Sequence, residues 1–137
     1  MKALLLLLAT TLLLQAGDHI AEFAQQYHYE TSYKTALAKA KKQNKDLMLV
    51  MVTHYCPWCR KFEQKTLKKK VIDTKISKRF IRLILNREKH NFPKKFDTPR
   101  IPTTYFIKAK DESILLTHMG YKNAEDFMQV LNKVPKN

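Results

Sequence analysis

The chain has 137 residues, of which 45% are hydrophobic and two are glycine. This length suits a single domain and the apolar content suffices for a packed core, which excludes disordered, collagen-like and long repeat chains. Lys and Arg number 26 against 12 Asp and Glu, a formal net charge of +14, and such a charge attracts acidic partners and anionic surfaces.

Residues 1–16 are predicted to be an export signal. Lys2 supplies a positive start, and residues 3–14 form an apolar run broken by two threonines. The run fits a secretory signal and is too short to cross a bilayer, although an uncleaved membrane tether is the alternative. Cleavage after Ala16 leaves a domain at residues 17–137. We therefore expect a periplasmic or secreted protein, for which nucleic acid is not a partner.

The first half of the domain alternates between helical and strand patterns. Residues 18–29 are mixed and partly helical, and Thr31 or Ser32 can cap a helix that runs to about residue 44. Residues 47–52 are continuously apolar, as in a central strand covered on both faces. A helical pattern then begins at Pro57, where the missing N–H costs nothing.

The second half continues the alternation and ends in a hairpin and a helix. A helix is expected at residues 71–78, with Val71, Ile72 and Ile76 facing inward. Strands are expected at residues 80–85, 103–107 and 114–117, with a loop at 86–100, a turn at 110–112 and a last helix from the cap Asn123 to 131. The order predicts an α/β fold, a three-layer α/β/α sandwich whose mixed central sheet has parallel strands first and an antiparallel hairpin last.

The two cysteines, Cys56 and Cys59, stand in a Cys-Pro-Trp-Cys segment after the predicted central strand. Thiols tend to pair in an oxidising compartment, and so small a ring restricts an unfolded chain little. The pair therefore favours a reversible redox couple. One alternative is a zinc site completed by two of His54, His90 and His118, although His90 and His118 are expected at the surface; another is a basic binding module with a structural disulfide.

The position of Cys56 at a predicted helix start favours its thiolate, because unpaired N–H groups and the helix dipole stabilise an anion there. His54, Arg60 and Lys61 add positive charge, and no acidic residue lies between Asp46 and Glu63 in the sequence to oppose it. Cys56 is expected to attack substrate disulfides, and Cys59 to resolve the mixed disulfide. Trp58 is expected to be exposed beside them.

The strand before Cys-Pro-Trp-Cys, the segment Ile101-Pro102-Thr103 before a later strand, and Gly120 before the last helix together resemble the thioredoxin superfamily over residues 30–134. The resemblance implies a thioredoxin fold, a redox-active disulfide with no other cofactor, and a cis bond before Pro102, which faces the disulfide. It also implies that Ile101 and Pro102 offer backbone groups to a substrate chain. With its export signal, the chain is most similar to the periplasmic bacterial branch.

The sequence departs from cytosolic thioredoxins at three places: Val50 replaces their buried Asp, Tyr55 their Trp, and Pro57-Trp58 their Gly-Pro. We expect an exported thiol:disulfide oxidoreductase that acts on protein thiols and disulfides, exchanges electrons with a membrane protein and is a monomer. A reductase is slightly favoured because of the Ile-Pro-Thr segment. An oxidase or isomerase is the alternative, since Val50 and the positive surroundings of Cys56 stabilise thiolate. The expected site comprises catalytic Cys56 and Cys59, substrate-binding Trp58, Ile101 and Pro102, and modulating Pro57 and His54.

Overall fold

The computed structural model describes residues 17–136, so the export signal predicted at residues 1–16 lies outside the described residues. The elements run α1 (His19–Tyr27), α2 (Tyr33–Gln43), β1 (Asp46–Val52), α3 (Pro57–Phe62), a π-helical turn (Glu63–Leu67), α4 (Lys70–Arg79), β2 (Phe80–Asn86), two 3₁₀ turns (Arg87–Lys89 and Lys94–Phe96), β3 (Thr103–Ile107), β4 (Ile114–Met119) and α5 (Ala124–Lys133).

The four strands form one sheet in the order β2-β1-β3-β4. β1 is parallel to β2 and antiparallel to β3, and β3 is antiparallel to β4. The predicted parallel pair and C-terminal hairpin are therefore confirmed. At the outer edge of β2, Glu30 forms a parallel bridge with Leu83.

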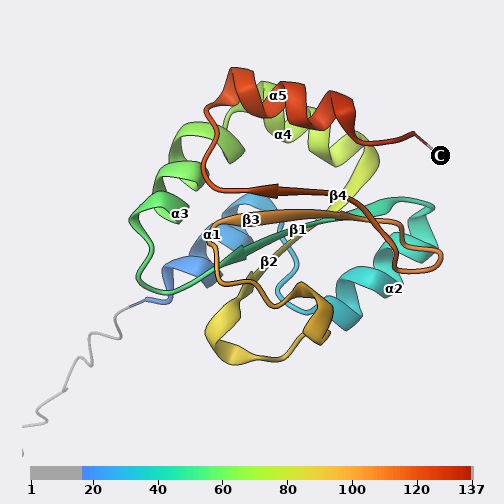
Figure 1. The fold of residues 1–137 in the computed structure, drawn as a ribbon, viewed down its shortest axis with the longest axis horizontal. Helices are drawn as coiled ribbons and strands as arrows, with labels where there is room; N and C mark the ends of the chain where they lie inside the picture. Colours follow the sequence, from blue (N-terminus) through green and yellow to red (C-terminus); the bar gives the residue numbers. More distant parts are fainter. Residues whose placement is uncertain (1–16, 137) are drawn as a thin grey trace, which may run out of the picture.

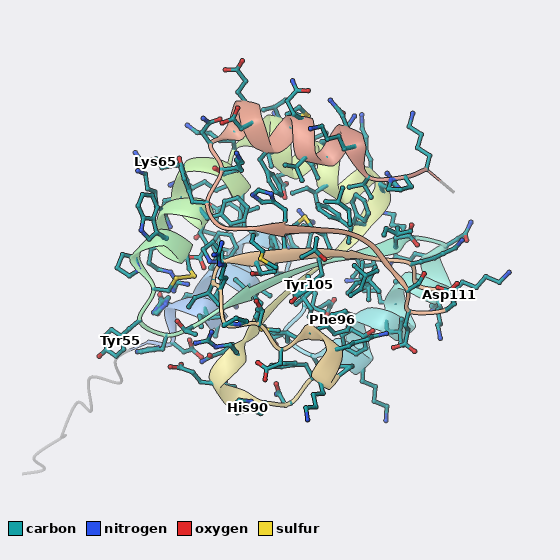
Figure 2. The ribbon with its side chains drawn as sticks, in the orientation of Figure 1. Tyr55, Lys65, His90, Phe96, Tyr105 and Asp111 are labelled. Atoms are coloured by element: carbon teal, nitrogen blue, oxygen red, sulfur yellow. A yellow bond between two sulfur atoms is a disulfide. The ribbon has the colours of Figure 1, made fainter. Side chains whose placement is uncertain are left out.

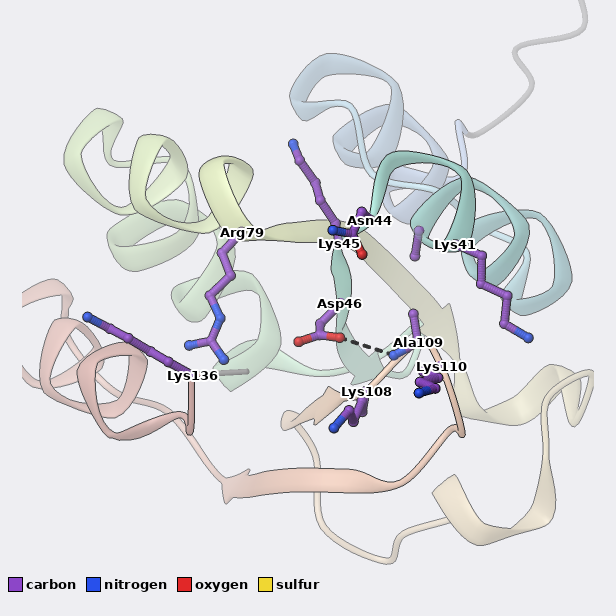
Figure 3. Close-up of a pocket in the computed structure, with 10 residues that line it drawn as sticks. Lys41, Asn44, Lys45, Asp46, Arg79, Lys108, Ala109, Lys110 and Lys136 are labelled. Carbon is purple, nitrogen blue, oxygen red and sulfur yellow. Dashed lines mark hydrogen bonds between the residues drawn. The ribbon is translucent and has the colours of Figure 1, made fainter.

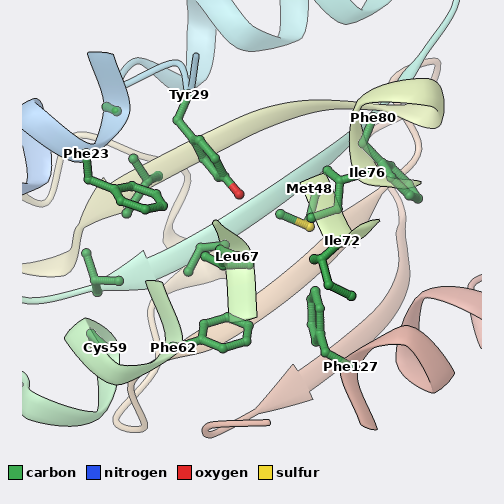
Figure 4. Close-up of a cluster of buried hydrophobic side chains, with 14 of the residues drawn as sticks. Phe23, Tyr29, Met48, Cys59, Phe62, Leu67, Ile72, Ile76, Phe80 and Phe127 are labelled. Carbon is green, nitrogen blue, oxygen red and sulfur yellow. The ribbon is translucent and has the colours of Figure 1, made fainter. Parts of the chain in front are cut away.

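Helices cover both faces of the sheet, which confirms the predicted three-layer sandwich (Figure 1). Side chains alternate along a strand, so Met48, Val50 and Val52 of β1 face a cluster that includes residues of α1, α3, α4 and α5. Figure 4 shows this cluster, in which the Phe62 ring of α3 lies 5.0 Å from the Phe127 ring of α5. The alternate residues of β1 face α2 and the loop after β2. All seven residues of β1 are buried, as expected of a strand covered twice.

The predicted helix starts agree with the side-chain caps. The Ser32 hydroxyl accepts from the Thr35 N–H at the start of α2, and the Asn123 side chain accepts from the Asp126 N–H at the start of α5. The prediction that Val71 faces inward is wrong: its side chain is 64% exposed. Ile72 and Ile76 occupy the buried face of α4, and successive helical residues point about 100° apart, which turns Val71 towards solvent.

The loop at residues 86–100 carries two 3₁₀ turns, in agreement with its predicted irregularity. Phe96 from the second turn is fully buried, and its ring lies 5.4 Å from Tyr33 and 5.3 Å from Tyr105. Figure 2 shows Phe96 and Tyr105 together between this loop and the sheet. The loop thus completes the layer that α2 begins. None of the helices within residues 17–136 has the length and apolar character needed to span a bilayer.

Candidate active site

The carboxyl end of β1 leads directly to the two cysteines. β1 ends at Val52, and Cys56 is the N-cap of α3, with Pro57 as the first helical residue. Cys56 and Cys59 form a disulfide, and Cys56 Sγ accepts a hydrogen bond of 3.1 Å from the Cys59 backbone N–H. The predicted placement of Cys56 at a helix start is therefore confirmed, and an N–H donor is in place for its thiolate.

The two sulfur-bearing residues differ in accessibility. Cys56 is 7% exposed, whereas Cys59 is fully buried one helical turn deeper, in the same cluster as Val50 and Phe62. A partner can reach Cys56 first, and Cys59 is accessible only to Cys56. This asymmetry fits an attacking Cys56 and a resolving Cys59.

The loop before β3 lies at the same end of the sheet. The peptide bond between Ile101 and Pro102 is cis, as the resemblance implied. Thr103 pairs with Met51 in the sheet, so Pro102 lies opposite the end of β1 from which the disulfide loop departs. Ile101 packs against the cluster that contains both cysteines. Pro102 O accepts from the Gly120 N–H at 2.7 Å, and Gly120 holds a φ of +89°, which favours glycine.

Three large apolar side chains are exposed around this end of the sheet: Tyr55 at 89%, Trp58 at 55% and Met119 at 52%. We call them the apolar rim. Met119 pairs with Thr103 next to Pro102, and the Trp58 ring lies 5.6 Å from Tyr121, two residues beyond Met119. The predicted exposure of Trp58 is confirmed, and Tyr55 points outward in Figure 2. Exposed apolar side chains at the same end of a sheet as a reactive disulfide suit contact with a protein partner.

The family model of the thioredoxin-like domain matches residues 33–135. The chain belongs to the thioredoxin-like family. This membership, the four-stranded mixed sheet and the Cys56–Cys59 disulfide confirm the predicted thioredoxin fold. Together they also identify thiol:disulfide exchange as the chemistry of this thioredoxin-like chain.

Solved structures show the same fold. A thioredoxin from Thermus thermophilus has a TM-score of 0.67 and 20% identity, over 76% of this chain and 84% of that one. The DsbH oxidoreductase has a TM-score of 0.66 and 18% identity, over 77% of this chain and 82% of that one. The C-terminal domain of Neisseria meningitidis DsbD, in its oxidised form, has a TM-score of 0.60 and 19% identity, over 74% of this chain and 92% of that one. At these identities the likeness shows the fold alone. The comparison with curated protein sequences found no match.

The sequence predicted positive charge around the disulfide with no acidic residue to oppose it, but the structure brings two carboxyl groups close to this site. Arg60 donates to Glu63 Oε1 at 2.7 Å, so its guanidinium is paired. The backbone N–H of His54 donates to Glu88 Oε2 at 3.2 Å, which brings a second carboxylate to the loop before Cys56. The Nζ of Lys61 lies 4.8 Å from the Trp58 ring centroid and 5.0 Å from that of Tyr121, as a cation over two aromatic faces.

Glu63 is the site residue that the sequence prediction missed. Its N–H bonds to Cys59 O, which places it one helical turn beyond the resolving cysteine, and its side chain is only 2% exposed. Burial raises the pKa of Glu63 to about 7, and the nearby Arg60 opposes this rise. The available signal was its spacing of four from Cys59, which puts both on one helix face.

The histidines do not assemble with the cysteines into a zinc site. His54 is exposed and its ring lies 5.0 Å from His19 and 4.9 Å from Tyr55. His90 is at the surface as expected, but His118 on β4 is only partly exposed, and burial lowers its pKa. Within residues 17–136, no three His, Cys, Asp or Glu side chains converge as a bound metal requires.

The variant Glu63→Gln tests the buried carboxyl. Because burial raises its pKa from an ordinary value of 4.5 to about 7, the folded protein holds this proton more tightly than the unfolded chain. The wild-type free energy of unfolding therefore falls as pH rises through this interval, and the glutamine variant escapes that loss. Between about pH 5 and pH 8, urea denaturation should show that the free energy of unfolding of the variant rises relative to that of the wild type, by at most about 3 kcal/mol.

The matched control is Glu125→Gln, an exposed glutamate in the first turn of α5. Its stability curve should run parallel to that of the wild type at all pH values. Parallel curves for Glu63→Gln as well would contradict a carboxyl that titrates near neutral pH.

Proposed function

We propose that the protein is an exported thiol:disulfide reductase, which reduces disulfides of misoxidised proteins or of apocytochrome and is kept reduced by a membrane electron donor. The observation that carries the proposal is the disulfide at the start of α3, with only Cys56 within reach of a partner. In the reduced protein, the Cys56 thiolate attacks a substrate disulfide, which forms a mixed disulfide and releases one substrate thiolate. The Cys59 thiolate then attacks Cys56 Sγ, which releases the second substrate thiolate and restores the Cys56–Cys59 disulfide.

The carboxylates near the site favour reduction over oxidation. A strongly stabilised thiolate makes a disulfide oxidising, because it stabilises the reduced form. Here Arg60 donates a hydrogen bond to Glu63, and Glu88 lies against the loop that leads to Cys56. The positive surroundings on which the oxidase alternative rested are therefore weaker than the sequence suggests. The Cys59 N–H and the helix start still activate Cys56 as a nucleophile.

Glu63 also has a chemical role in this proposal. Cys59 must lose its proton before it can attack Cys56, and the position of the buried Asp of cytosolic thioredoxins is Val50 here. Glu63 lies one turn from Cys59 and its pKa of about 7 suits a group that accepts and returns a proton at neutral pH. Glu63 thus serves as the buried acid of this site from the active-site helix instead of from β1.

Protein substrates are proposed to bind across the apolar rim and the Ile101–Pro102 loop. The loop offers backbone groups to an extended chain, which gives affinity with little demand on sequence. The exposed side chains of Trp58 and Met119 offer apolar contacts, and Pro57 fixes the helix start. His54, which contacts Tyr55 and donates to Glu88 through its backbone N–H, is proposed to modulate Cys56. The protein is proposed to act as a monomer without a separate cofactor.

The reduction potential tests the direction of electron flow. In glutathione buffers, followed by Trp58 fluorescence and thiol alkylation, the mature protein should equilibrate at about −270 mV, the level of thioredoxins. A value of about −120 mV, the level of strong oxidants, would reverse the assignment to an oxidase. A cysteine pair that never exchanges with glutathione would contradict both the reductase and the oxidase roles, and would favour a basic binding module with a structural disulfide. The variant Cys56→Ser is the control, because it abolishes exchange.

The variant Trp58→Ala tests the substrate surface. An exposed aromatic anchor contributes about 1–2 kcal/mol to a protein contact, so KM for a protein disulfide should rise about 5- to 30-fold. The rate with glutathione disulfide should stay unchanged, because that small substrate does not need the rim. Val71→Ala, an exposed apolar residue on α4 away from the site, is the control. Equal loss with both substrates would show that Trp58 supports the disulfide rather than the substrate.

Export is tested by expressing the full chain in a bacterium with two membranes and measuring protein mass in each fraction. The expected product is a periplasmic protein that begins at Gly17. An intact chain in the membrane fraction would indicate a tether, and an intact chain in the cytoplasm would refute export.

A further inference from the structure

A cavity lies at the opposite end of the sheet from the disulfide. Its volume is about 760 Å³, and six of the ten residues that line it are cationic: Lys41, Lys45, Arg79, Lys108, Lys110 and Lys136. They come from the end of α2, the approach to β1, the end of α4, the segment after β3 and the C-terminal segment, as Figure 3 shows. The fold therefore gathers charges that are far apart in the sequence.

Two of these cations are fixed by neutral groups. Lys45 Nζ donates to Ser77 O at 2.7 Å, and Arg79 donates to the carbonyl oxygens of Val134, at 2.9 Å, and Pro135. Carbonyl groups orient a cation without cancelling its charge. The ion pairs found within residues 17–136 involve Lys39, Arg60, Arg82 and Lys89, and none of these four residues lines the cavity.

One carboxylate belongs to the cavity. Asp46 is buried at the start of β1, and its Oδ1 accepts from the Ala109 N–H at 3.1 Å (Figure 3). This bond ties the segment after β3 to the start of β1 and so holds Lys108 and Lys110 beside the cavity. Asp46 thus stabilises the lining, and its single negative charge is outnumbered by the six positive ones.

The size and charge of the cavity define its ligand. The volume falls in the range of small-molecule sites, roughly 300–1,000 Å³, yet the lining is cationic rather than aromatic. Clustered Lys and Arg suit phosphate oxygens, to which they give charge-assisted hydrogen bonds. We propose that this cavity binds a compact anion that carries two or more phosphate groups, as a soluble oligophosphate or a lipid head group.

Ligand binding there leaves the disulfide free. β1 joins the cavity, at Asp46, to the active-site loop, after Val52. Its seven residues at about 3.3 Å each separate the two sites by about 20 Å. A bound anion can hold the protein without covering Cys56, so the two sites can be tested independently.

The experiment compares two triple variants of the full mature protein by calorimetric titration with tripolyphosphate. The cavity variant is Lys41→Gln, Lys108→Gln and Lys110→Gln. The control variant removes the same three positive charges at exposed lysines that do not line the cavity: Lys65→Gln, Lys69→Gln and Lys70→Gln. The cavity variant should bind at least about tenfold more weakly than the wild type, since each lost contact to a charged group is worth more than 1 kcal/mol. The control should change by less than about twofold.

Two further measurements complete the test. The amide signals of Asn44 and Ala109 should shift on titration of the wild type, and both variants should retain wild-type exchange with glutathione disulfide, which shows that they fold. Phosphatidylcholine vesicles with cardiolipin identify the source: loss of vesicle binding in the cavity variant alone assigns a lipid head group, and equal vesicle binding by both variants assigns a soluble oligophosphate. Equal weakening of tripolyphosphate binding in both variants, or no binding by the wild type, would overturn the proposal.

Discussion

Burial of β1 on both faces is the constraint on which the rest of the structure depends. Its alternate residues serve two separate clusters, one under α1, α3, α4 and α5 and one under α2 and the loop after β2. A strand so enclosed cannot shift by one residue without exchanging the side chains of the two layers. Its ends are therefore fixed in space, with the disulfide loop at one end and the cationic cavity at the other.

Because the end of β1 is fixed, the loop after it can hold the reactive Cys56 sulfur in a defined position at the N-terminus of α3. Cys56 caps α3, and the Cys59 N–H bonds to its sulfur. Gly120 anchors the neighbouring loop through Pro102 O. Each contact joins backbone that the sheet has already placed, so little conformational freedom remains to be lost when a substrate binds. Preorganisation of this kind suits an exchange reaction that needs three sulfur atoms in line.

Much of this architecture follows from local sequence. The continuous apolar run of β1, the caps Ser32 and Asn123 and the hairpin of β3 and β4 were predictable because each depends on neighbouring residues. Glu88 was not, because its position beside the site depends on how β2 packs, and the spacing of Glu63 from Cys59 did not reveal that its carboxyl is buried against Arg60. The cavity cations escaped prediction for the same reason: no short segment of sequence contains them together. Val71 was misplaced because three apolar residues of α4 cannot all occupy one face.

The bridge between Glu30 and Leu83 has a consequence for self-association. β2 is an edge strand of the sheet, and such edges offer unpaired backbone groups to other chains. Here the Glu30 N–H donates to Arg82 O and Glu30 O accepts from the Ile84 N–H, so the chain occupies part of its own edge. An extended segment from another molecule would have to displace Glu30, which protects β2 from the strand-to-strand growth that starts aggregation.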